Sequence, residues 1–71
     1  MKILIENAET REFLSTNGLW TKKPDRAATF ATTQAAHTAA KSEPIRKFNI
    51  VGHFGGTGQF INLDKGSGKG A

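Results

Sequence analysis

The dipeptide Asn17-Gly18 constrains the fold of this chain more strongly than any other feature. It lies between Phe13-Leu14-Ser15-Thr16 and Leu19-Trp20-Thr21, two short segments rich in apolar residues. Two adjacent residues that tolerate positive φ favour a tight turn between antiparallel strands. The sequence therefore predicts a β-hairpin close to the N-terminus.

The rest of the chain predicts an α+β fold. Ile3 and Ile5 alternate with Lys2, Leu4 and Glu6, which adds a first strand and makes residues 2–21 a three-stranded antiparallel meander. An alanine-rich stretch before Pro44 predicts one short helix, and later alternation predicts more strands. The expected layout is βββαββ, with the meander followed by a helix over 33–42, a returning strand over 46–54 and a C-terminal hairpin ending in an edge strand over 59–63.

The expected helix has an apolar face made of small residues, namely Ala35, Ala36, Ala39 and Ala40. His37 is expected on its solvent face. In the returning strand, Phe48, Ile50 and Phe54 alternate with Lys47, Asn49, Val51 and His53. Because alanine buries little area, the tryptophan and the phenylalanines are expected to complete the core.

Length and composition indicate one domain without covalent cross-links. The chain has 71 residues and no cysteine, and we expect a single domain over 1–63 with a flexible Gly/Lys tail over 64–71. No apolar run reaches the roughly 18 residues of a membrane span. The N-terminus has too short an apolar stretch for a secretory signal, so we expect a cytoplasmic protein.

No motif in the sequence predicts catalysis. The glycines near the C-terminus lack the spacing of a phosphate-binding loop, because Leu63 and Gly70 stand where a glycine and a hydroxyl residue are needed. His37 and His53 are expected on different elements, which does not suit a metal site. We therefore expect no enzyme activity, no cofactor and no small-molecule substrate.

The order of core and turn residues resembles that of a group of small bacterial proteins of unassigned function, built from a strand meander, a helix and a returning strand. The resemblance covers residues 3–54. It rests on Ile3-x-Ile5-x-Asn7, Phe13-Leu14-Ser15, Gly18-x-Trp20-Thr21, Ala28-x-Phe30-x-Thr32, Ala36 with Ala39, and Ile50-Val51 with Phe54. The resemblance implies the fold and carries no catalytic or ligand residues.

We therefore expect a non-enzymatic protein-binding or regulatory module, whose partner is another protein or a second copy of the chain. A phage-type inhibitor of a host protein and a bacterial adaptor both fit this pattern. The expected protein contacts are Trp20, Val51, His53 and Phe60.

Nucleic-acid binding is the alternative, because ten Lys and Arg against six Asp and Glu give a net charge of +4. A phosphate-contacting patch would require five basic residues from two segments to share one face. These residues are Lys22, Lys23, Arg26, Arg46 and Lys47.

Overall fold

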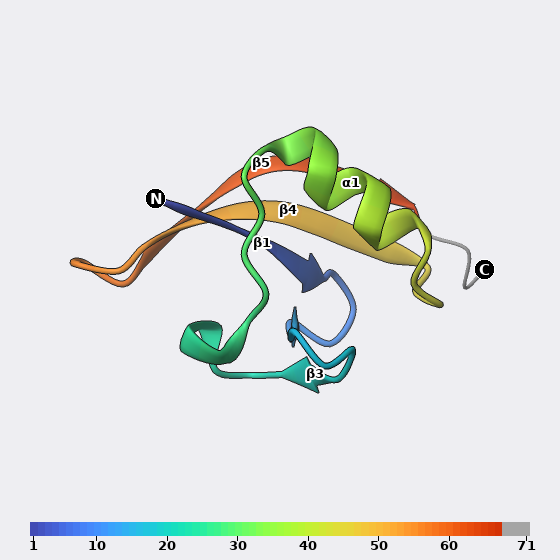
Figure 1. Cartoon of the computed structure of the whole chain (residues 1–71), viewed down its shortest axis with the longest axis horizontal. Helices are drawn as coiled ribbons and strands as arrows, with labels where there is room; N and C mark the ends of the chain where they lie inside the picture. The colour runs from blue at the N-terminus through green and yellow to red at the C-terminus, as the bar shows by residue number, and fades with distance from the viewer. Residues whose placement is uncertain (68–71) are drawn as a thin grey trace.

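One antiparallel sheet of five strands, in the order β3-β2-β1-β4-β5, organises the molecule. The structure is a computed structural model that describes residues 1–67. Its elements are β1 (Lys2–Asn7), β2 (Phe13–Leu14), β3 (Trp20–Thr21), the 3-10 turn η1 (Pro24–Arg26), α1 (Thr33–Lys41), β4 (Lys47–Phe54) and β5 (Gln59–Ser67). This order confirms the predicted βββαββ layout and the α+β class. In Figure 1, α1 lies above β1 and β4, and β3 and η1 are at the bottom of the view. The helices formed by residues 1–67 include none long and apolar enough to cross a membrane.

The predicted hairpin at Asn17-Gly18 is present, with a different turn. Strands β2 and β3 pair, and the Ser15 N–H donates to the Leu19 carbonyl at 2.8 Å. Of the two turn residues, Gly18 alone has a positive φ, of 82°, so the expectation of two adjacent positive-φ residues is wrong for Asn17. The Asn17 Oδ1 instead accepts the Leu19 N–H at 3.2 Å. The loop therefore needs one left-handed residue, as three-residue hairpin loops commonly do.

The larger core lies between α1 and the sheet. Thr32 caps the helix by accepting the Ala35 N–H at 3.0 Å. Ala36 and Ala40, one turn apart, are fully buried and belong to the same cluster as Phe48 and Ile50. Ala35 is exposed, contrary to prediction, because it lies more than a quarter turn from the line joining those two alanines.

A smaller core lies on the opposite face of the sheet. Leu4 and Val51 are paired across β1 and β4, and Phe13 and Ala27 complete their cluster. Val51 is only 5% exposed, so the expectation that it offers a contact surface is wrong. Burying both faces of the central strands explains why Leu4 and Ile5, neighbours in sequence, are both inaccessible to solvent.

Strand β5 is longer than predicted. It continues to Ser67, so residues 64–67 belong to the sheet and not to a tail, and the expected tail residues 68–71 lie outside the described part. The pairing shifts register between Ile50 and Val51, which makes Leu63 the extra residue of a β-bulge. The β4–β5 hairpin extends well beyond the helix in Figure 1.

Replacing Gly66 by alanine tests whether this end of β5 is packed. A Cβ at this position would lie 2.7 Å from Phe48 Cζ and 3.3 Å from His37 Cε1. Because Phe48 is fully buried, we expect Gly66→Ala to destabilise the fold by about 1–3 kcal/mol, and each kcal/mol to lower Tm by about 4–8 °C.

The matched control is Gly56→Ala, since a Cβ there has nothing within 4 Å. This variant should change stability by no more than about 1 kcal/mol, in the stabilising direction. Thermal unfolding followed by circular dichroism measures both. Equal Tm values for the two variants would show that residues 64–67 do not pack on Phe48.

Candidate functional site

Exposed large hydrophobic side chains gather at the far half of the β4–β5 hairpin. Of the five such residues among those described, four lie there, and the fifth, Leu19, lies in the β2–β3 loop. We call the four the hairpin surface, which comprises Met1 (63% exposed), Phe54 (38%), Phe60 (43%) and Ile61 (43%). A cluster of exposed apolar side chains marks an interaction surface more often than isolated apolar residues do.

The helix is too short to cover this half of the hairpin. Nine helical residues span about 13–14 Å, whereas the eight residues of β4 span about 26 Å. In Figure 1, α1 lies over the half of the hairpin where β4 begins, and the turn at the far end is uncovered. Phe54 was expected in the core; it is on the helix side of β4, but the helix does not reach it.

On the helix side, Gly52 allows the hairpin surface to form. A Cβ on Gly52 would overlap the Met1 side chain and lie 3.2 Å from Ile61 Cγ1. Met1 and Phe54 also line an open hollow of about 390 Å³ with the turn residues. The surface on this side is therefore apolar and slightly concave.

On the opposite side, three aromatic rings stack across the sheet. The Phe60 ring lies 4.5 Å from the His53 ring and 5.3 Å from the Phe13 ring, measured between centroids. Phe13 and Phe60 belong to β2 and β5, which in a flat sheet would be about 14 Å apart. Their contact shows that the sheet curls, and it holds the far half of the hairpin in place from this side.

Of the four expected protein contacts, the structure brings two together, His53 and Phe60. Trp20 is half-buried on β3, at the other edge of the sheet, where it packs against the core on the helix side and lines a groove of about 550 Å³. Val51 is interior. The sequence reasoning missed Met1 and the exposure of Phe54. For Phe54 the signal was the predicted helix over 33–42, which is shorter than the strand it was expected to cover.

The five residues of the expected nucleic-acid patch fall in two groups. Lys22, Lys23 and Arg26 follow β3, whereas Arg46 and Lys47 stand at the start of β4. Strands β2 and β1 lie between β3 and β4 in the sheet order. The two groups therefore stand at strands that are not neighbours.

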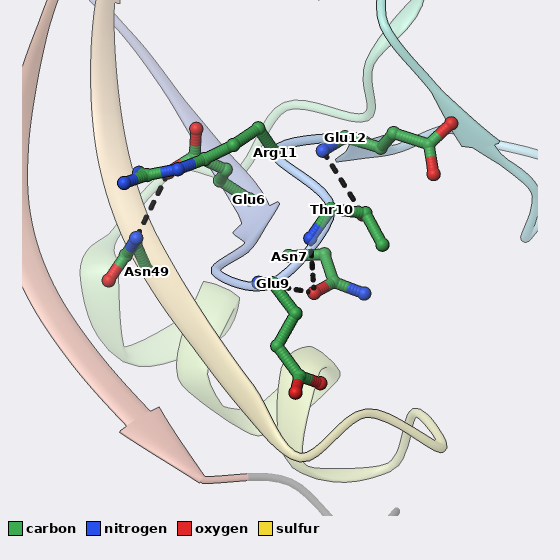
Figure 2. A network of polar contacts seen from close by, with 7 residues as sticks. All are labelled: Glu6, Asn7, Glu9, Thr10, Arg11, Glu12 and Asn49. Atoms are coloured by element: carbon green, nitrogen blue, oxygen red, sulfur yellow. Dashed lines mark hydrogen bonds and ion pairs between the residues drawn. The ribbon is translucent and has the colours of Figure 1, made fainter.

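A polar network fixes the turn between β1 and β2 (Figure 2). The Asn7 Oδ1 accepts the N–H of Glu9 at 2.9 Å and of Thr10 at 3.3 Å, which closes the loop. The loop ends at Arg11, a non-glycine residue with φ 63°. Arg11 Nη1 then reaches Glu6 Oε1 at 3.5 Å, and this oxygen also accepts from Asn49 Nδ2 at 3.0 Å. One oxygen of the Glu6 carboxylate thereby joins the loop to β4.

His37 joins the helix to β5, contrary to its expected place on the solvent face of the helix. Its Nε2 lies 2.7 Å from Asp64 Oδ2, and its ring meets the edge of Phe48 at 5.4 Å between centroids. The hydrogen bond with His37 is the main reason that the pKa of Asp64 lies below its usual 3.8, and the N–H of Lys65 lowers it further. Within residues 1–67, no three His, Cys, Asp or Glu side chains gather as metal ligands would.

The His37–Asp64 contact predicts a titration shift. In His37→Phe the ring contact with Phe48 is retained but the donor is lost, so the pKa of Asp64 should rise toward 3.8. Because the folded pKa is lowered, the contact stabilises the fold above pH 3.8, and this contribution is lost as the pH falls through the folded pKa. Carboxyl-carbon NMR against pH measures the midpoint. Identical midpoints in the two proteins would show that His37 does not hold Asp64 ionised.

Comparison with known proteins finds no match to a protein-family model, a curated protein or a solved structure. The hairpin surface, together with the edge of β5 beside it, is the feature of the described residues on which a function can be proposed.

Proposed function

We propose that this protein is a non-enzymatic protein-binding module, and that it binds an extended apolar segment of a partner protein along the far half of the β4–β5 hairpin. The observation that carries the proposal is the hairpin surface, a cluster of four exposed large hydrophobic residues at the far half of the β4–β5 hairpin in a small, basic domain. Such an arrangement costs solubility, and burial by a partner would recover that cost.

The size of the hairpin surface argues for an additional source of affinity. Full burial of a side chain such as Phe or Ile contributes about 1.5–3 kcal/mol, and Phe54, Phe60 and Ile61 are already more than half buried. Association itself opposes binding by about 4–15 kcal/mol. Contact with these side chains alone would therefore give weak binding.

The open edge of β5 supplies this additional affinity. Strand β5 is the last strand in the sheet order, so one side of its backbone has no neighbouring strand among residues 1–67. An extended segment can add to such an edge through main-chain hydrogen bonds, with alternate side chains entering neighbouring apolar hollows. The regular run Gln59–Asn62, before the bulge at Leu63, adjoins the hairpin surface and would pair with four to five residues of the partner.

Selection from a random octapeptide phage library against immobilised protein tests the proposal. Wild-type protein should enrich peptides with apolar residues at alternate positions, because a strand presents every second side chain to one face. Ile61→Lys should reduce the affinity of the enriched peptides at least about tenfold, since a charge would enter an apolar contact.

Leu19→Lys is the matched control, because Leu19 is also exposed (65%) but lies away from the hairpin. It should bind the same peptides as the wild type. No enrichment, or enrichment that survives Ile61→Lys, would contradict the proposal. Salt-sensitive binding of a random single-stranded oligonucleotide without peptide binding would favour the nucleic-acid alternative. A dimer seen by light scattering in the wild type and lost in Ile61→Lys would show that the partner is a second copy of the chain.

A further inference from the structure

Two lysines lie together at the opposite end of the same hairpin. In the β4–β5 register, Lys47 is paired with Ser67, and Asn49 with Lys65. Directly paired residues of antiparallel strands share a face, so Lys47 and Lys65 are diagonal neighbours on the side of the sheet away from α1, about 7–8 Å apart. They line one hollow of about 340 Å³ together with Ser67 and Asn49.

The carboxylates of Glu6 and Asp64 are bonded to groups other than these lysines. The ion pairs among residues 1–67 are Arg11–Glu6 and His37–Asp64, and neither includes Lys47 or Lys65. Glu6 is held by Arg11 and Asn49, as Figure 2 shows. Asp64 pairs with Ile50 in the register and bonds to His37, which places its carboxylate on the helix side of the sheet.

From these contacts, and resting on the proposed function, we propose that Lys47, Lys65 and Ser67 form an anion subsite that takes an acidic side chain of the bound segment. The ammonium groups and the hydroxyl are donors suited to a carboxylate. Charge complementarity also favours an acidic segment over a second copy, because each copy carries a net charge of +4. No acidic residue occurs between Lys47 and Leu63 to oppose such a ligand.

The subsite sets the spacing of the motif that the protein would recognise. Lys65 and Ile61 are four residues apart on β5, about 13 Å along the strand. A segment that runs antiparallel to β5 meets the lysine end first and the hairpin surface later. We therefore expect an acidic residue about four to six positions before the alternating apolar residues of the partner segment.

An NMR titration of the whole chain with acetyl-tetraglutamate amide tests the subsite apart from the hairpin surface. The backbone amides of Lys47, Lys65 and Ser67 should shift with this peptide and not with its tetraglutamine analogue. The double variant Lys47→Gln/Lys65→Gln should weaken binding at least about fivefold, as loss of two exposed ion pairs predicts. Raising the salt concentration from about 50 to 500 mM should weaken wild-type binding in the same way.

Lys22→Gln/Lys23→Gln makes the same change of charge beyond β3 and is the matched control; it should bind like the wild type. Equal losses in both double variants would overturn the subsite, since net charge alone would then explain binding. Inorganic phosphate, titrated separately, would overturn the peptide assignment if it bound the same residues more tightly than tetraglutamate.

Ile61→Lys separates the two proposals, because it should reduce the affinity of the apolar peptides at least about tenfold without weakening tetraglutamate binding. If the octapeptides bind through Ile61 but tetraglutamate does not shift Lys47 and Lys65, the subsite fails and the proposed function stands. If tetraglutamate binds and no octapeptide is enriched, the proposed function fails, and with it the role of the subsite in reading a partner segment.

Discussion

The packing of two alanines of α1 on Phe48 determines the rest of the architecture. Ala36 and Ala40 present almost no side chain, so the helix approaches the sheet closely and the large ring of Phe48 fills the space between them. Gly66 on β5 leaves room for the same ring. The helix and the start of the β4–β5 hairpin are thereby locked together at one end of the sheet. The other end has no such cover, because the helix stops before it.

The far half of the hairpin is nevertheless held in a defined position. Phe60 stacks on Phe13 and His53 across the curled side of the sheet, and Met1 lies over Gly52 on the other side. These contacts hold the backbone of the far half of the hairpin in place, while its apolar side chains stay partly exposed to solvent. A surface of this kind loses little conformational entropy on binding, which favours affinity for a given contact area.

The order of elements could be predicted from the sequence because each element has a local signal: the turn at Asn17-Gly18, the alanine-rich stretch before Pro44 and the alternation after Arg46. The burial of Val51 could not, because it depends on Phe13 reaching it from a distant strand. The end of β5 was hidden by its composition, since Gly and Lys are typical of tails and only the contact of Gly66 with Phe48 gives it a place. Of the candidate site, His53 and Phe60 followed from strand alternation. The lysine pair required the register of residues 64–67, the part of β5 that the sequence did not indicate.

The bulge at Leu63 has a consequence for the protein in isolation. A long apolar strand with one bare side is a template for cross-β growth, in which copies add edge to edge without limit. The extra residue twists the strand, and the charges of Asp64 and Lys65 follow immediately, so the flat stretch available for stacking ends after four residues. This length suits a short guest strand and is too short to template the continued edge-to-edge addition of further copies.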